Sequence, residues 1–270
     1  MNPSFPRESE ISRSPEDRLN RSGLLALLAG WLLLQVLPIP VAHAQESTTP
    51  PPTPESQVLS SLQDIYDEFW RYQLEVSPML AAEYGDQSAM GKLPESGIKT
   101  INRDLQKYFE FFNAMYALDL SLISVKDRQQ AEILINIIEN RLDGIRVGEH
   151  LTPINQRRGP QVWLPRLHSQ MRFSQMENYR HYLSRLEQVP AYVAGVQEIL
   201  ERAVSEGFLP PRVTLMGVLD QFKACTSPAP ADSLFYQPFQ EMPPGTNPEE
   251  WNQILQKAQS VIGEKVQPAL

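Results

Sequence analysis

Apolar residues recur three and four positions apart along most of the chain, and this spacing is the feature that most restricts its fold. Within residues 57–76, for example, Val58, Leu62, Ile65 and Phe69 repeat at that interval, with acidic residues between them. Such a period places these side chains on one face of an α-helix. We find no alternating pattern of useful length, which would indicate a β-strand. The sequence therefore predicts an all-α fold, a multi-helix domain with long proline-rich loops.

Helix start and stop signals divide this pattern into segments. Ser77-Pro78 interrupts it because the residue before a proline is pushed out of the α region. Ser96 is an expected N-cap for the next helix, and Gly148 is an expected stop for the one after it. We therefore expect helices at 57–76, 98–120, 124–148, 174–186, 190–207 and 210–222, and from 247 towards residue 270.

Three further signals concern the later helices and the width of one apolar face. Ser174 and Glu177 have the spacing of a capping box, and Pro190 suits the first turn of a new helix. Asn247-Pro248 combines a cap residue with a proline at the first helical position. Ile133 and Ile137 widen the apolar face of the helix after Ser124, which predicts that this helix is buried on two sides.

The first residues have the pattern of a Sec signal peptide. Arg18 and Arg21 precede an apolar run from Gly23 to Leu34, and Ala42-His43-Ala44 supplies a small-x-small cleavage site. We expect a signal peptide at 1–44, a Pro/Ser/Thr-rich linker at 45–56 and a helical domain at 57–270. The alternative is an uncleaved membrane anchor. Either way the protein is expected to be exported, to a periplasmic or extracellular location.

The net charge of −8 argues against nucleic acid as a partner, because binding to phosphates depends mainly on Lys and Arg. Cys225 is the single cysteine, so the chain contains no internal disulfide. We interpret this residue as core or surface filler, because a nucleophilic thiol needs a neighbouring base and a lowered pKa that the sequence does not indicate.

Catalytic motifs are not evident. There is no His-Glu-x-x-His pair for zinc, no Gly-x-Ser-x-Gly turn and no phosphate-binding glycine loop. After the expected signal peptide the histidines are His150, His168 and His181. Glu177 and His181 stand four residues apart on an expected helix and could share a metal, although a surface ion pair explains the same spacing.

One segment, residues 141–172, is positively charged although the chain as a whole is acidic. Six arginines lie between Arg141 and Arg172, against only Asp143 and Glu149. Guanidinium groups offer forked donors that suit carboxylates and phosphates. We hypothesise that Arg157 and Arg158, in the irregular stretch 150–173, bind an anionic group or an acidic partner surface. The alternative is an ordinary solvated face.

A set of landmarks resembles the N-terminal half of a bacterial family known as domain of unknown function 885. They are Ser77-Pro78 with Gly85, Asn155-Gln156 with Gly159, Tyr182-x-x-Arg185-Leu186 leading to Pro190-x-Tyr192, Gly207 with Pro210-Pro211, Pro238-Phe239 and Val266-x-Pro268-Ala269. The family is mostly secreted and all-helical, and it is similar to gluzincin-type zinc metallopeptidases. The resemblance implies a zinc motif in a following half. It therefore places no catalytic residue, metal ligand or cofactor in this chain.

Two functional interpretations follow. In the first, the chain is the N-terminal half of a zinc metallopeptidase or hydrolase, inactive alone, with a separately encoded C-terminal half as partner and a peptide-like ligand. In the second, it is a non-catalytic helical binding or scaffold domain outside the cytoplasm. Membrane contact is expected only through an uncleaved signal segment.

Overall fold

The computed structural model describes residues 51–270. The expected signal peptide and the first part of the expected linker therefore lie outside the described residues. The described part is helical and contains no β-strand between residues 51 and 270, in agreement with the predicted all-α class. Its α-helices are α1 (Pro54–Val76), α2 (Pro78–Glu83), α3 (Ile98–Tyr116), α4 (Val125–Arg146), α5 (Pro160–Trp163), α6 (Met176–Ser205), α7 (Arg212–Leu215), α8 (Val218–Thr226), α9 (Pro248–Val261) and α10 (Gln267–Ala269).

Shorter turns connect these helices. The irregular stretch at 150–173 contains more regular structure than expected, because α5 is followed directly by a 3₁₀ segment. A π-helical turn joins α9 to α10. The 3₁₀ segments are η2 (Gln87–Ala89), η3 (Leu120–Leu122), η4 (Glu149–Leu151), η5 (Leu164–Gln170), η6 (Pro230–Asp232) and η7 (Leu234–Gln240), and the π turn is η8 (Ile262–Val266).

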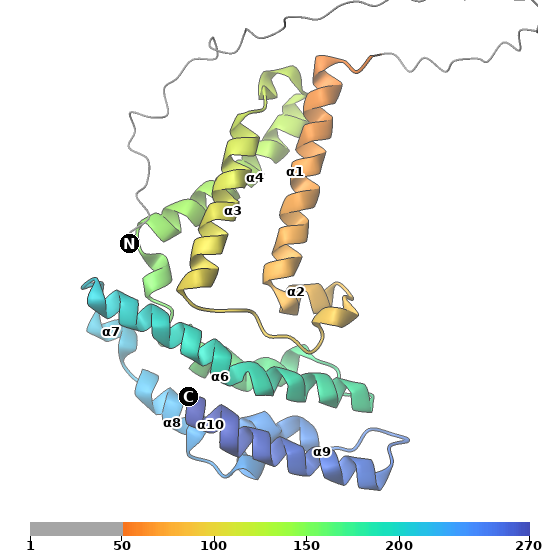
Figure 1. Ribbon diagram of the computed structural model, residues 1–270, viewed down its shortest axis with the longest axis vertical. Helices are drawn as coiled ribbons and strands as arrows, with labels where there is room; N and C mark the ends of the chain where they lie inside the picture. The colour runs from red at the N-terminus through yellow and green to blue at the C-terminus, as the bar shows by residue number, and fades with distance from the viewer. Residues whose placement is uncertain (1–50) are drawn as a thin grey trace, which may run out of the picture. The chain divides into compact units, whose positions relative to one another are not determined.

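Two large apolar cores and a small cluster of Leu151, Ile199 and Ala203 organise the helices. Figure 1 shows how these helices are arranged. The first lies between α1, α3 and α4, where the apolar stripes of the three helices meet; Phe111, Met115 and Ile138 are almost inaccessible to solvent there. The second surrounds the first half of α6, against which α9, η5 and η7 pack. Each helix is therefore stabilised mainly by burying one amphipathic face.

The hydroxyl groups of two core tyrosines on α6 find backbone partners. Tyr182 donates to the carbonyl of Phe235 at 3.0 Å, and Tyr179 donates to the carbonyl of Glu241 at 2.8 Å. A buried hydroxyl needs such a partner because an unsatisfied one is costly. These bonds tie the second core to the loop that carries η7.

An extended segment, residues 91–97, crosses one stripe of α6. Ser184 and Gln188 donate to the carbonyl of Gly91 at 2.9 and 2.7 Å, and Ser96 donates to the carbonyl of Tyr192 at 2.5 Å. The crossing is close at Gly195, where a Cβ atom would stand 2.6 Å from the backbone of Ser96. This stripe of α6 therefore contributes to the link between the two large cores, together with the packing of Ile199 and Ala203 against the start of α3.

Ser96 is consequently not the N-cap that we expected. Its hydroxyl is used by Tyr192, and Gly97 occupies the cap position with φ of 109°. The first amide of α3, that of Ile98, donates instead to the carboxylate of Glu198 at 3.1 Å. The cap is supplied by a distant helix, which local sequence does not reveal.

Two expectations about α6 are also corrected. Gln175, not Ser174, is its N-cap, and the side chain of Asn178 accepts from the Gln175 amide at 3.1 Å. Pro190 lies inside this single helix rather than at the start of a new one. Because Leu186 and Val196 on either side of it pack into buried positions, the helix continues despite the hydrogen bond that proline removes.

Other boundaries and faces differ in smaller ways. α1 begins at Pro54, three residues before the expected start, because Thr53 caps it. α3 ends at Tyr116 rather than near residue 120. Ile133 and Ile137 are 61% and 47% exposed, so α4 is not buried on two sides as expected.

Candidate functional site

The predicted anion-binding arginines lie on an exposed turn after η4. Asn155 holds this turn through its side-chain oxygen, which accepts from the amides of Arg157 and Arg158 at 2.8 and 2.9 Å. The Arg158 guanidinium pairs with Glu149 at 3.1 Å and donates to the Thr152 carbonyl. Arg157 forms no side-chain hydrogen bond or ion pair with any described residue. The two arginines therefore lie on the same exposed turn.

The two residues of the candidate metal pair lie next to each other on α6. His181 Nε2 lies 3.4 Å from Glu177 Oε1, and Glu177 also accepts from Arg180 at 2.8 Å. A zinc site needs three or four ligands, and within residues 51–270 no group of three His, Cys, Asp or Glu side chains could hold a metal ion. The described residues do not fit a zinc site, and we derive no zinc chemistry from them.

Cys225 is buried on α8, as expected for core filler. Its thiol lies 3.7 Å from the carbonyl of Gln161, and burial raises the pKa of the thiol. A raised pKa lowers the fraction of nucleophilic thiolate. This cysteine therefore lacks the activation that a catalytic role requires.

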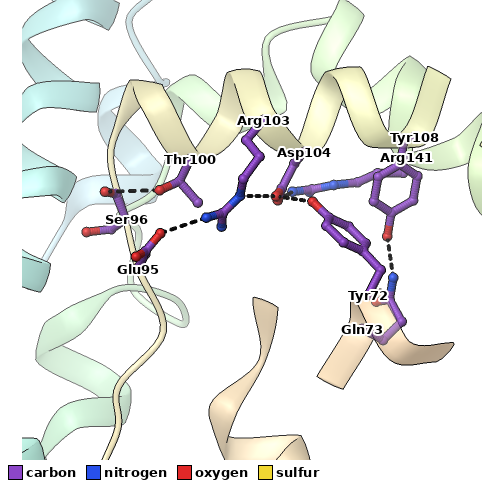
Figure 2. Close-up of polar contacts among 9 residues, drawn as sticks. All are labelled: Tyr72, Gln73, Glu95, Ser96, Thr100, Arg103, Asp104, Tyr108 and Arg141. Carbon is purple, nitrogen blue, oxygen red and sulfur yellow. Dashed lines mark hydrogen bonds and ion pairs between the residues drawn. The ribbon is translucent and has the colours of Figure 1, made fainter. Parts of the chain in front are cut away.

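A network of charged and phenolic groups joins α1, α3 and α4 (Figure 2). Asp104 accepts from the Tyr72 hydroxyl at 2.6 Å and pairs with Arg141 at 3.4 Å. Arg103 lies 4.0 Å from the same carboxylate and pairs with Glu95 at 2.9 Å. Burial, followed by the Asp104 interaction, raises the pKa of Tyr72. We call this set the Asp104 network; its charges neutralise one another.

A cavity of about 400 Å³ lies beside the Asp104 network, between residues 93–103 and α6. Several of its polar groups already have partners, since Arg103 pairs with Glu95 and Gln188 accepts from the Leu93 amide at 3.0 Å. Such internal pairing leaves little unsatisfied polarity for a ligand.

A second cavity, of about 720 Å³, lies between α2, the end of η5 and α6, and we call it the Arg185 cavity. Arg185 is only 2% exposed, and its Nε is buried with no hydrogen-bond partner. Burial lowers the pKa of Arg185, although a guanidinium stays charged at neutral pH. Other lining residues are Met79, Leu80, Ala82, Glu83, Met90, Gln170, Met171, Arg172, Asn178 and His181.

Exposed apolar side chains gather on one segment at the end of α6. Of the large apolar residues that are exposed in the described part, seven lie between residues 204 and 219: Val204, Phe208, Leu209, Val213, Leu215, Met216 and Leu219. The backbone beneath them is held in place, because Gln156 donates to the carbonyls of Val213 and Thr214 at 2.8 and 3.1 Å. We call these seven residues the 204–219 surface.

No helix within residues 51–270 is both long and apolar enough to cross a bilayer.

Residues 78–270 match the family model described as "Bacterial protein of unknown function (DUF885)". The chain belongs to this family. Comparison with curated proteins gives no match. The predicted resemblance to the DUF885 family is thus confirmed, and the family landmarks now have places in the fold: Ser77-Pro78 separates α1 from α2, and Arg185 lies in the cavity on α6.

The fold of this DUF885 chain is similar to that of a solved structure, "the putative lipoprotein from Colwellia psychrerythraea". The TM-score is 0.64 at 15% sequence identity, so the likeness concerns the fold. The match covers 80% of this chain and 40% of the other, which is therefore much longer than the part that this chain matches.

Arg185 is the site residue that sequence reasoning missed, although it was noted as a landmark. Its signal was present in the sequence: Tyr182, Leu183, Leu186 and Val189 form an apolar face, and Arg185 interrupts that face with a charge. An arginine on the buried face of a helix needs either a partner or a function.

Proposed function

We propose that this DUF885 chain forms the N-terminal helical half of a larger exported hydrolase-like fold. The observation that carries this proposal is the 204–219 surface. Soluble proteins rarely expose large contiguous apolar patches unless these form an interface. Here the exposed apolar side chains lie close together along the chain, and two carbonyls of this segment, those of Val213 and Thr214, accept hydrogen bonds from Gln156. Both observations support a docking surface.

The solved relative supplies a second argument. This chain matches only 40% of that protein, so the same fold occurs elsewhere with a substantial further part. We propose that a second helical half of this kind packs against the 204–219 surface, whether it is supplied by the same chain or by another. Zinc and the catalytic glutamate would belong to that half, and this assignment rests on the family's similarity to gluzincin-type metallopeptidases, a fold-level analogy.

The expected location outside the cytoplasm is part of the same proposal. It is supported by the charged start, apolar run and small-x-small site of residues 1–44. The solved structure of similar fold carries the description "putative lipoprotein", which is compatible with export.

The first test is genetic and biochemical. The DNA after the codon for Leu270 is read in all three frames, and any helical segment with a His-Glu-x-x-x-x-His-like motif is co-expressed with this chain. We expect the two parts to co-purify and to hydrolyse peptides together. Two parts that never associate, or that associate without hydrolysing peptides, would contradict the proposal.

The second test targets the 204–219 surface directly. The triple variant Leu209→Ser, Val213→Ser, Leu219→Ser is expected to abolish co-purification and to reduce self-association of the chain in analytical ultracentrifugation. Its control is Ile133→Ser with Ile137→Ser, because these apolar residues are also exposed but lie on α4. Equal effects of the two variants would show that the surface has no special role.

A stand-alone binding domain is the second candidate function, and the Arg185 cavity favours it. A buried charge that faces an open cavity is typical of a ligand site. Under this alternative the chain is a soluble, cooperatively folding monomer that binds a ligand without transforming it.

A further inference from the structure

Arg185 carries a charge that the described protein does not neutralise. It forms no hydrogen bond or ion pair with any residue of the described part, and its Nε is shielded from solvent. Leaving a buried charge without a partner destabilises a protein strongly. Such a charge on the otherwise apolar face of α6 therefore indicates an anionic partner that comes from outside the described residues.

The surroundings of Arg185 limit the charge of that partner. Two arginines, Arg185 and Arg172, line the cavity together with one acid, Glu83. His181 also lines it, and its Nε2 lies 3.4 Å from Glu177 Oε1. Arg172 and Glu83 are exposed at the rim, whereas Arg185 is buried. A lining with this small positive excess fits one negative charge better than the two charges of a phosphate monoester.

The other residues that line the cavity indicate that the uncharged part of the ligand is apolar. Met79, Met90 and Met171 reach the cavity from three different segments, and Leu80 adds to them. Methionine side chains are flexible and polarisable, so they adapt to apolar groups of different shape. The volume of about 720 Å³ lies in the range of cavities that hold small organic ligands.

We propose that the Arg185 cavity binds a small organic carboxylate with an apolar body, whose two oxygens accept a forked pair of hydrogen bonds from the Arg185 guanidinium while the methionines contact the body. Forked pairing of this kind is the strongest geometry that arginine offers a carboxylate. The free end of an apolar peptide and an N-acylated amino acid share this chemistry. The inference rests on residues 79–185 and uses none of the observations that support a second half.

The experiment measures binding by isothermal titration calorimetry with three probes on the unaltered protein. N-acetylleucine carries the carboxylate and the apolar body, N-acetylleucinamide has the same shape without the charge, and inorganic phosphate tests a different anion. We expect N-acetylleucine to bind at least about tenfold more tightly than either of the others. Equal affinity for the acid and the amide, tighter binding of phosphate, or no binding of N-acetylleucine at millimolar concentration would overturn the proposal.

Three variants locate the binding. Arg185→Met is expected to abolish binding of N-acetylleucine, and Arg185→Lys to weaken it because an ammonium group cannot donate a planar fork. Arg180→Gln is the matched control: Arg180 is on the same helix, but it is exposed and paired with Glu177 and Glu250. Unchanged binding in Arg185→Lys, or equal loss in Arg180→Gln, would refute the assignment. If Arg185→Met fails to fold, the comparison of N-acetylleucine with N-acetylleucinamide on the unaltered protein still tests whether binding requires the carboxylate.

Discussion

Arg103 and Arg185 differ in their burial and in their acidic partners. Arg103 is partly exposed, pairs with Glu95 and lies next to the carboxylate of Asp104 in a network that joins three helices. Arg185 is almost fully buried and has no acidic partner in the described part. The first arrangement contributes to the stability of the protein. The second reduces stability and is understandable only if something binds there. Proximity to acids thus separates a structural charge from a functional one.

The largest effect is expected from removing the acid at the centre of the Asp104 network. Asp104→Ala leaves the Tyr72 hydroxyl, which is largely buried, without its acceptor and removes the partner of Arg141. We expect the free energy of unfolding to fall by about 2 kcal/mol, within the usual cost of an unsatisfied buried polar group. Urea denaturation measures it. Asp143→Ala removes an exposed acid paired with Arg146 and should lower the free energy of unfolding by less than about 0.5 kcal/mol. Similar losses in both variants would show that the Asp104 network is no more stabilising than an exposed ion pair.

The opposite sign is expected at Arg185. Arg185→Met replaces an uncompensated buried charge by an apolar side chain of similar length, so the free energy of unfolding should stay the same or rise by about 1 kcal/mol. Urea denaturation in the absence of added ligand is the measurement. A loss of more than about 1 kcal/mol would mean that Arg185 has a structural partner, and the comparison with Arg103 would fail.

Alkaline pH provides a third test. Burial raises the pKa of both Tyr72 and Tyr182. The folded protein therefore keeps these phenolic protons to higher pH than the unfolded chain, whose tyrosines titrate near about 10. Because the folded state then binds more protons, the free energy of unfolding is expected to fall as the pH rises past about 10. Tyr72→Phe should make this fall shallower; a fall of equal slope would show that Tyr72 does not contribute.

The smallest effect is expected at the exposed arginines. Replacing Arg157 and Arg158 by Ala removes one exposed ion pair, that between Arg158 and Glu149. The expected change in the free energy of unfolding is below about 0.5 kcal/mol, and binding of N-acetylleucine should be unchanged. A loss of ligand binding in this double variant would instead support the anion site predicted from the local excess of arginines.

Local signals in the sequence predicted some elements well. Asn247-Pro248 begins α9, and the Asn247 side chain accepts from the Glu249 amide as a cap should. Ser124 caps α4 in the same way, with its hydroxyl accepting from the Asp127 amide. These interactions join residues two or three positions apart, so the sequence pattern contains all the information that they require.

Non-local interactions explain what the sequence did not predict. The sequence around Pro190 predicts the start of a new helix, but buried residues on both sides of this proline keep α6 continuous. The local excess of arginines predicted an anion site at Arg157 and Arg158. Arg185, which lines a cavity, is instead a single charged residue among apolar neighbours on α6. Its burial depends on α2 and η5, which reach it from distant parts of the chain.

The Glu198 carboxylate that caps α3 has a consequence for the order of folding. It accepts from the amide of Ile98, 100 positions earlier in the chain, so the first turn of α3 lacks this bond until α6 has been synthesised. Synthesis and export proceed from the N-terminus, so α3 emerges before α6, the helix that supplies this contact. Closing so large a loop slows folding, and the intact unit is expected to form late and cooperatively rather than helix by helix.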